Sequence, residues 1–306
     1  MGSVWFAVVS VLVLVQLSFA DAVMKNSCTV SSGNVYVIYP GSDCTVFAQW
    51  AINNPSGSLQ HCPKGMKFNT EPCQCDLASK VQCPASNPPL DCVDLPPAGI
   101  SVSGIYNFTV NSQEMTAYCD MVTPGGGWLV FQRRETSIQK PLDFYQGMYA
   151  YENGFGQLGF EFWWGLQNLY QLTNPANNIR TYNLRVDLKD FNGKTGYGYF
   201  SNFYIGGPSD GYRLHLGGLE EGIIGDSFIG IKNMMFCTRD ADCNNMAATH
   251  HGGWWYSDDT RSNLNGNGTH QGNYSGDVPD GVYYETFRGI WYSLESTRMA
   301  LKPLHT

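Results

Sequence analysis

The chain has 306 residues, a net charge of −8 and a pI near 5.1. This acidic balance argues against nucleic acid or an anionic membrane as the main partner, because both repel a negatively charged protein surface. The length exceeds that of one typical domain and suits one small domain followed by a larger one.

The N-terminus carries the pattern of a secretory signal peptide. Residues 4–17 form an apolar run, and small residues follow at Ser18 and Ala20. A membrane anchor is the alternative, but this run is shorter than the ~20 residues that a membrane-spanning helix needs. The sequence therefore predicts a signal peptide at residues 1–20, cleavage after Ala20, and a secreted, extracellular protein.

Ten cysteines in a secreted chain favour five disulfides. Six of them fall between Cys28 and Cys83, and the other four are spread over the longer remainder. Residues 21–86 therefore predict a small domain that depends on disulfides, because so short a segment buries little apolar area. Alternation at residues 35–39 and turn residues at 40–43 indicate short β-strands within it.

Three stretches of this small domain, VYVIYPGSDCTVFAQW, HCPKGMKFN and CDLASKVQC, resemble the peritrophin-A type of chitin-binding domain. The resemblance implies aromatic rings that stack on N-acetylglucosamine. The third cysteine of that family falls at Trp50, which leaves Cys73 as a candidate partner of Cys28. A disulfide-stapled spacer without a ligand is the alternative. The cysteines that match are Cys28, Cys44, Cys62, Cys75 and Cys83, and the candidate chitin-binding residues are Tyr39, Phe47 and Trp50.

A change of composition marks the beginning of the second domain. Residues 85–89 have the composition of a proline-stiffened linker, and strand-like runs begin after Leu90. A long cysteine-free stretch separates Cys92 and Cys119 from the next cysteine, so these two are expected to pair with each other.

Later segments of the second domain indicate both helix and strand. Residues 166–172 have the apolar spacing of a short helix. Alternating patterns at 182–191, 196–205 and 212–219 indicate antiparallel strands with polar outer faces. The predicted fold class is therefore α+β.

Several long motifs of the second domain, in the same order, resemble the fibrinogen C-terminal domain, which is the module of ficolins, tachylectins and invertebrate fibrinogen-related proteins. The motifs are CDMVTPGGGWLVFQRR, DFYQGMYAYENGFGQLGFEFWWG, GGWWY, SNLNG and RGIWYSLESTRMALKP. The resemblance covers roughly residues 90–304 and places the domain at residues 87–306. It implies an α+β domain with antiparallel sheets and short helices, preceded by the small disulfide-rich β domain.

Oxygen-bearing side chains alternate at Asp240, Asp242 and Asn244, a spacing that suits calcium, which binds six to eight oxygens at about 2.3–2.6 Å. The fibrinogen-domain resemblance implies a specific ligand set for Ca²⁺. It consists of the carboxylates of Asp240 and Asp242 and the backbone carbonyls of Asn244 and Met246. A solvated acidic turn is the alternative.

The same resemblance implies a relocated disulfide. The family joins a cysteine shortly before the tryptophan pair to one just after it, and here these places hold Met246 and Asp259. Two cysteines stand instead at Cys237 and Cys243, on either side of the aspartates. We expect these two to pair and to clamp the calcium loop.

A carbohydrate site is expected beside this loop, because family members hold ligands in an aromatic pocket next to the disulfide. Tyr256, Tyr284 and Trp291 are candidate walls, and His250 is a candidate polar contact. Trp254 and Trp255 are either further walls or part of the core. Acetyl-sugar specificity is not implied, because the family's pocket residues have changed. The candidate ligand-binding residues are His250, Tyr256, Asp259, Thr260, Tyr284 and Trp291.

Three N-x-[ST] sequons, at Asn107, Asn267 and Asn273, predict a glycoprotein. Asn267 and Asn273 follow shortly after the expected ligand site in the sequence. Glycans on these two residues would therefore border the site.

We find no pattern that assembles a nucleophile with a base, so we expect no enzymatic activity. The sequence predicts a secreted, calcium-binding, lectin-like pattern-recognition protein of innate immunity that binds microbial or chitin-type glycans, N-acetylated sugars among them. No nucleic acid and no membrane are expected as partners, and a homo-oligomer is compatible with the sequence. The alternative is an extracellular matrix or mucus module that binds protein without binding sugar.

Overall fold

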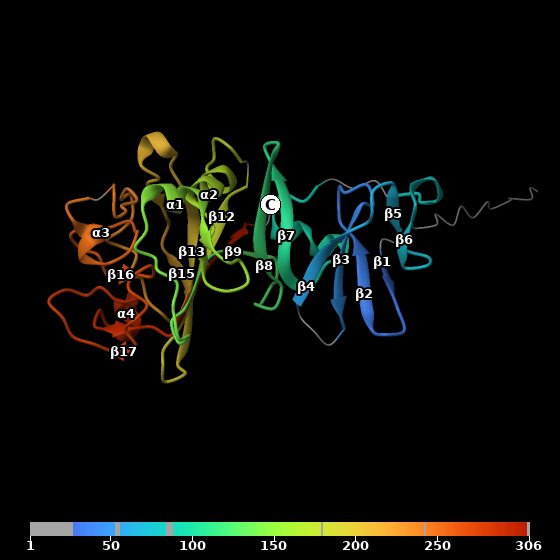
Figure 1. The fold of residues 1–306 in the computed structure, drawn as a ribbon. Coiled ribbons are helices and arrows are strands. Elements are labelled where there is room, and N and C mark those ends of the chain that lie inside the picture. The colour runs from blue at the N-terminus through green and yellow to red at the C-terminus, as the bar shows by residue number, and fades with distance from the viewer. Residues whose placement is uncertain (1–26, 53–55, 84–87, 179, 242, 305–306) are drawn as a thin grey trace, which may run out of the picture.

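The structure is a computed structural model that describes residues 27–52, 56–83, 88–178, 180–241 and 243–304. The predicted signal peptide lies outside the described residues. The molecule is elongated, with the N-terminal strands at one end and the short elements around α3 and α4 at the other (Figure 1). Most of the regular structure is sheet, and the helices are few and short.

The N-terminal strands form an antiparallel meander beside a small hairpin. The strands are β1 (Ser27–Thr29), β2 (Asn34–Ile38), β3 (Val46–Ala51) and β4 (Ser56–His61), with the hairpin of β5 (Met66–Asn69) and β6 (Gln74–Leu77) and the 3₁₀ turn η1 (Ala78–Lys80). Three disulfides, Cys28–Cys73, Cys44–Cys83 and Cys62–Cys75, connect these elements. Cys28 thus pairs with Cys73, its candidate partner.

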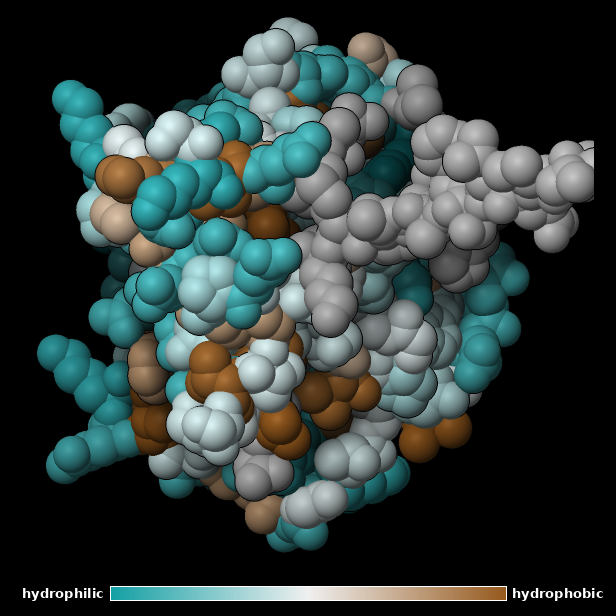
Figure 2. Space-filling view, turned by 90° about the vertical axis from the view of Figure 1, so that its right-hand side faces the viewer, coloured by the Kyte–Doolittle hydropathy of each residue, from teal (hydrophilic) through white to brown (hydrophobic). Residues whose placement is uncertain are grey.

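A small core holds this region together. The rings of Phe47 and Phe68 stack with centroids 4.3 Å apart, and Tyr36 packs against both. Disulfides surround these rings, as expected of a domain with too little apolar area to be stable alone. The outer end of the molecule shows polar side chains mixed with apolar ones (Figure 2), and Ile52 and Leu77 are exposed apolar residues of this region.

The predicted chitin-binding residues do not form an exposed aromatic surface together. Phe47 is buried in the small core, and Tyr39 is buried against Tyr106 of the second domain, with ring centroids 6.3 Å apart. Both side chains therefore serve packing, which corrects the expectation that they stack on a sugar. Trp50 on β3 is only partly buried and packs against the main core.

The two predicted domains share one sheet. Strand β4 pairs in parallel with β7 (Ser103–Val110), with Gly57 opposite Gly104. The Tyr39 hydroxyl donates a hydrogen bond to the carbonyl of Asn107, on the same strand β7. Pro88, from the predicted linker, lies against Gly41 of the N-terminal region. The junction is therefore a packed contact as well as a covalent connection.

The second domain continues this sheet. The complete order is β1-β2-β3-β4-β7-β8-β9-β20-β12-β13-β14, and all of its neighbouring pairs are antiparallel except β4 with β7. The added strands are β8 (Gln113–Asp120), β9 (Trp128–Glu135), β12 (Tyr182–Lys189), β13 (Thr195–Ile205), β14 (Leu214–His215) and β20 (Ser296–Pro303), with β10 (Phe155–Gly156), β11 (Phe162–Trp163) and β15 (Leu219–Gly222) at its margins.

Two helices pack on this sheet. They are α1 (Met148–Asn153) and α2 (Leu166–Thr173), and the second matches the helix predicted at residues 166–172. Leu166, Leu169 and Leu172 are buried at the i, i+3, i+6 positions of α2, which places its apolar stripe in the core. Their burial explains why so short a segment is helical, since isolated helices of this length are marginal in water.

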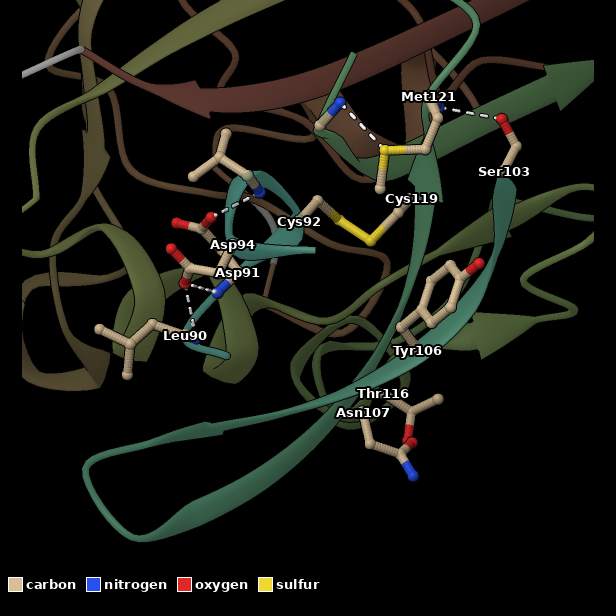
Figure 3. Close-up of a disulfide and its surroundings, with 12 residues drawn as sticks. Leu90, Asp91, Cys92, Asp94, Ser103, Tyr106, Asn107, Thr116, Cys119 and Met121 are labelled. Atoms are coloured by element: carbon tan, nitrogen blue, oxygen red, sulfur yellow. Dashed lines mark hydrogen bonds between the residues drawn. A yellow bond between two sulfur atoms is a disulfide. The ribbon is translucent and has the colours of Figure 1, made fainter. Parts of the chain in front are cut away.

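The predicted Cys92–Cys119 disulfide ties the start of the second domain to β8 (Figure 3). Cys92 begins the 3₁₀ turn η2 (Cys92–Asp94), which leads into η3 (Pro96–Ala98). The Asp91 carboxylate accepts a hydrogen bond from Val93 N (3.0 Å), and that of Asp94 accepts one from Asp91 N (3.2 Å). These bonds cap the turn and hold the disulfide in place.

The remaining elements are short and lie in the loop lobe, a name we use for residues 225–291. They are α3 (Met246–Thr249), α4 (Glu285–Arg288), β16 (Ser262–Asn263), β17 (Gly272–Asn273) and β18 (Tyr283–Tyr284). Strand β19 (Tyr292–Ser293) follows directly, and η4 (Pro208–Asp210) precedes the lobe. The antiparallel pairs β16–β18 and β17–β19 give the lobe its limited regular structure.

The junction of the two domains predicts the effect of one substitution. A methyl group at Gly104 would lie 2.6 Å from the Gly57 carbonyl oxygen, so Gly104→Ala must push β4 away from β7. We expect a loss of about 1–3 kcal/mol in the free energy of unfolding, measured by thermal or denaturant melts. Gly159→Ala is the matched control, because no atom lies within 4 Å of its added methyl group. Equal stability of the two variants would show that β4 and β7 are not packed as described.

Candidate ligand and calcium site

The tryptophan pair forms the interior of the loop lobe. Trp254 and Trp255 are fully buried, and the indole of Trp255 donates a hydrogen bond to the Tyr212 carbonyl (2.9 Å). The backbone of Trp254 pairs with that of Cys237 in both directions, at 2.9 and 3.0 Å. The structure therefore places Trp254 and Trp255 in the core and not in the wall of a ligand site.

The SNLNG motif satisfies the backbone of the loops around it. The side-chain amide of Asn263 donates to the His250 carbonyl (2.8 Å), and that of Asn265 donates to the Gly253 carbonyl (3.0 Å). Both asparagines are fully buried. These bonds replace the backbone hydrogen bonds of strands or helices, which the loops lack. They also hold the segment that follows the calcium loop in place.

The calcium loop, residues 237–246, is closed by a disulfide between Cys237 and Cys243. Asn244 and Asn245 both adopt left-handed backbone conformations, with φ of 54° and 62°. Asparagine tolerates this conformation better than most residues, which explains its presence directly before α3. The loop therefore makes a tight turn between the core and this short helix.

Asp240 is hydrogen-bonded to a helix that lies 92 residues earlier in the sequence. Its Oδ1 accepts hydrogen bonds from the backbone amide of Met148 (2.7 Å), at the start of α1, and from the hydroxyl of Thr238 (2.9 Å). These two bonds lower the pKa of the Asp240 carboxyl. A methyl group at Gly147 would lie 2.5 Å from Asp240 Oδ2. The Asp240 carboxylate can therefore lie this close to the start of α1 only because residue 147 is glycine.

The described part of the proposed calcium set has the right chemistry for Ca²⁺. Asp240 supplies an exposed carboxylate, and the carbonyls of Asn244 and Met246 are hard oxygen donors of the kind that calcium prefers. The Met246 carbonyl also accepts the backbone hydrogen bond of His250 (2.9 Å) within α3. Asp242 lies outside the described residues, and within the described ranges, the calcium loop included, no three His, Cys, Asp or Glu side chains gather as a metal site. Calcium binding therefore stays a prediction.

A hollow of about 490 Å³, which we call the loop hollow, lies directly beside the calcium loop. It brings together residues of the predicted calcium set and of the predicted ligand set. Its volume lies within the range of small-molecule sites. The lining residues are Arg213, Gly230, Met234, Met235, Cys243, Asn244, Met246, Tyr256, Ser257, Asp258 and Asp259.

Two of the predicted ligand residues, Tyr256 and Asp259, line the loop hollow. His250 lies behind Tyr256, with the two rings stacked 5.2 Å apart, and its Nδ1 is 2.7 Å from the Pro279 carbonyl. Burial lowers the pKa of His250, so the imidazole is neutral at neutral pH. His250 therefore supports the wall and does not itself line the hollow.

The other three predicted ligand residues lie elsewhere, which corrects the expectation of one site. Tyr284 is buried in the core, where its hydroxyl donates to the Gly225 carbonyl (2.9 Å). The Thr260 hydroxyl is used within its own turn, by donation to the Ser257 carbonyl (2.7 Å). Trp291 is partly exposed but packs against Tyr274 at 5.6 Å, outside the lining of the loop hollow.

Three residues that line the loop hollow, Arg213, Met234 and Met235, are not predicted as site residues by any pattern in the sequence. They precede the calcium loop and belong to no recognisable motif. The backbone of Met234 bonds to Leu214 (3.0 Å), and the Arg213 guanidinium donates to Asp210 (3.2 Å), so both are held beside β14. The only local signal for the two methionines is that they are consecutive in the sequence.

A larger hollow of about 620 Å³ lies over the exposed face of strands β9, β12, β13 and β20. Three of its arginines, Arg134, Arg185 and Arg298, are already paired with carboxylates within the protein. Arg185 and Arg298 both bind the Asp187 carboxylate, at 2.6 and 2.7 Å, and Arg298 also binds Asp120. The loop hollow is the better candidate for a ligand site, because it brings Tyr256 and Asp259 of the predicted ligand set next to Asn244 and Met246.

The anchoring of Asp240 predicts a change in its titration. Thr238→Val removes one hydrogen bond to the carboxylate and should raise the pKa of Asp240 toward its ordinary value near 3.9. The wild-type bonds stabilise the fold above about pH 4, and their contribution is lost as the pH falls through the lowered pKa. Carboxyl NMR titration in EDTA measures the shift, with Thr116→Val on β8 as a control. An identical Asp240 pKa in Thr238→Val would contradict the contact.

The three sequons differ in accessibility, which predicts a pattern of glycosylation. Asn107 and Asn273 are exposed, whereas Asn267 is half-buried and its amide donates to the Asp280 carboxylate (3.3 Å). We expect glycans on Asn107 and Asn273 and an unmodified Asn267 in protein secreted by eukaryotic cells. Enzymatic deglycosylation followed by peptide mass spectrometry reads each site, and full occupancy at Asn267 would overturn the assignment.

No helix within the described ranges is long and apolar enough to cross a membrane. Several related proteins align over much of the chain. Fibrinogen C domain-containing protein 1-A of Xenopus laevis is 34% identical over 294 residues, which cover 90% of this chain and 59% of that protein. The corresponding 1-B protein is 37% identical and covers 72% of this chain and 49% of that protein. The chain therefore spans about half to three fifths of these relatives.

Other relatives match over a larger share of their own length. Human ficolin-3 is 37% identical over 219 residues, which cover 70% of both chains. The fibrinogen-like globe domain of human ANGPTL6 aligns with a TM-score of 0.66 and 35% identity over 74% of this chain and all of that one. Lamprey fibrin D-dimer, in complex with the peptide Gly-His-Arg-Pro-amide, aligns with a TM-score of 0.62 and 28% identity over 71% of this chain and 75% of that one.

The sequence model described as the C-terminal globular domain of fibrinogen beta and gamma chains matches residues 88–304. These residues contain the sheet from β7 to β20, both longer helices and the whole loop lobe. The match and the structural alignments agree in extent, and they confirm the predicted fold. This chain belongs to the fibrinogen C-terminal globular domain family.

Proposed function

We propose that the protein is a secreted, calcium-binding, lectin-like pattern-recognition protein that binds microbial or chitin-type glycans in innate immunity. The observation that supports this proposal most directly is the loop hollow. It unites Asn244 and Met246 of the calcium loop with Tyr256 and Asp259 of the expected ligand site. All ten cysteines are described and disulfide-bonded, which suits an oxidising, extracellular environment.

Calcium in this proposal shapes the hollow without touching the ligand. Asp240, Asp242 and the carbonyls of Asn244 and Met246 would hold the ion, and the bound ion would supply positive charge that fixes these oxygens. Asn244 and Met246 also line the loop hollow, so ordering the loop orders one wall of the hollow. The Cys237–Cys243 disulfide limits the freedom of the same segment.

The loop hollow offers complementary groups to a saccharide. Tyr256 lines the hollow, but its ring is largely buried, so it offers only a small apolar surface to the apolar face of a sugar ring. Arg213, Asp258 and Asp259 supply charged groups that hydrogen-bond to hydroxyls or amides. We propose binding and not catalysis, in keeping with the fold family.

The N-terminal region adds a second candidate surface for chitin. We propose Trp50 as its contact, because this side chain is only partly buried while Tyr39 and Phe47 are buried. The N-terminal strands and the loop lobe lie at opposite ends of the molecule (Figure 1). Two weak sites so arranged gain avidity only on an extended surface such as a polymer or a cell wall, which both ends reach together.

A protein-binding role without sugar is the second candidate function. Two observations favour it: Tyr284 is buried in the core, and Trp291 lies outside the loop hollow, so two expected sugar-stacking rings are missing from the site. The lamprey relative is recorded in complex with a peptide. Under this reading the protein is an extracellular matrix or mucus module.

Calcium binding predicts a stabilisation that depends on Asp240. At a free calcium concentration about 100-fold above Kd, the wild type should gain about 2.7 kcal/mol over its EDTA form, measured as a shift in Tm. Asp240→Asn removes the negative charge but keeps an oxygen acceptor for the Met148 amide, so its calcium-dependent shift should disappear while the EDTA form stays folded. Glu114→Gln, at an exposed position of β8, is the control. A full calcium shift in Asp240→Asn would contradict the metal assignment.

Retention of the purified protein on chitin, peptidoglycan and immobilised acetylated or plain sugars separates the candidate functions. The lectin proposal expects retention in calcium that is lost in EDTA. Retention on chitin that EDTA does not affect and that Trp50→Ala abolishes would assign the activity to the N-terminal region. No retention on any of these materials would favour the protein-binding function.

A further inference from the structure

We infer that the loop hollow accepts an unbranched acyl chain longer than acetyl. Three methionines line it: Met234, Met235 and Met246. Disulfide-bonded Cys243 and Tyr256 complete this part of the lining. The inference rests on the proposed glycan function for the sugar that would carry the chain. It concerns the chemistry of the group that enters the hollow, which the proposed function leaves open.

The methionines come from two separate segments. Met234 and Met235 lie in the loop before the calcium loop, and Met246 begins α3. Met234, Met246 and Cys243 are partly buried and pack against the main core, so the apolar lining continues inward from the surface. Met235 is 47% exposed, which leaves apolar surface at the opening of the hollow.

The backbone under these side chains is fixed. Leu214 N donates to the Met234 carbonyl (3.0 Å), and Asn233 N donates to the Leu214 carbonyl (2.7 Å). A methyl group at Gly211 would lie 3.0 Å from the sulfur of Met235, so one side of the Met235 side chain packs against the backbone at Gly211. The methionine side chains are therefore the adaptable part of a rigid frame.

Methionine is the residue best suited to a linear apolar guest. Its side chain is unbranched, rotates about three bonds and carries a polarisable thioether, so neighbouring methionines rearrange around guests of different length. A small aromatic cage selects a methyl group, whereas the loop hollow of about 490 Å³ is far larger than an acetyl group. Its apolar lining would remain partly in water unless a longer chain covered it.

The charged residues place the polar part of the ligand. Arg213, Asp258 and Asp259 line the same hollow. Asp210 (3.2 Å) and the Asn233 carbonyl hold the Arg213 guanidinium, and Asp259 is paired with Arg261 (2.9 Å). These fixed groups would bind the amide and hydroxyls of a sugar while its acyl chain contacts the methionines.

Calorimetric titration of the full chain in calcium tests the inference with glucosamine bearing N-acetyl, N-butanoyl or N-hexanoyl groups, and with hexanamide, which has no sugar. Each methylene buried among the methionines should raise the affinity by up to about fourfold. We expect the N-hexanoyl sugar to bind at least tenfold more tightly than the N-acetyl sugar.

Substitution of Met235 locates the effect. Met235→Gln keeps the length of the side chain but makes it polar, and should remove most of the gain in affinity from the longer acyl chain. Met235→Leu should retain the gain. Met66→Gln, on β5 of the N-terminal region, is the matched control, and thermal melts verify that each variant folds.

The outcomes separate this inference from the proposed function. Sugars that all bind with the same affinity would overturn the acyl preference and leave the glycan function standing. If hexanamide binds as tightly as N-hexanoylglucosamine, and Met235→Gln weakens both, the result would support the apolar site. It would also refute recognition of the sugar. An acyl-chain gain that persists in Met235→Gln, or the absence of binding by every probe, would overturn the inference.

Discussion

The loop lobe depends on a few buried side chains that do the work of regular secondary structure. Gln132 and Arg134 of β9 donate to the carbonyls of Leu264 (2.8 Å) and Gly266 (2.9 Å), and Asn263 and Asn265 bind the loops on the other side. Unsatisfied backbone groups would be costly in so buried a place. Glu161 accompanies Arg134 (3.3 Å), because an arginine that is fully buried requires a countercharge.

This anchoring gives the proposed site its character. The calcium loop leaves the core at Cys237, where its backbone is paired to the buried Trp254, and turns back through Asn244 and Asn245 into α3. One end of the loop is therefore rigid, and the disulfide holds the other end to it. A cation that orders the exposed part between these fixed ends would act directly on the wall of the loop hollow, which links metal and ligand without any larger conformational change.

The N-terminal region is an extension of the same sheet and not a module on a free linker. Pairing of β4 with β7, the Tyr39–Tyr106 stack and the contact of Pro88 with Gly41 restrict its orientation. The distance between the two ends of the molecule is consequently set by the sheet, and linker length does not control it. Avidity between Trp50 and the loop hollow would then depend on how well a surface matches this fixed span.

The sequence by itself determined the family, the Cys92–Cys119 and Cys237–Cys243 pairs and the helix at residues 166–172, because each rests on a local pattern or on long motifs that occur in the family's order. Only the tertiary structure decided which aromatic rings are core and that Met234 and Met235 join Tyr256 in one hollow. Burial and convergence arise from long-range packing, and an aromatic side chain has the same local pattern whether it faces a ligand or the interior.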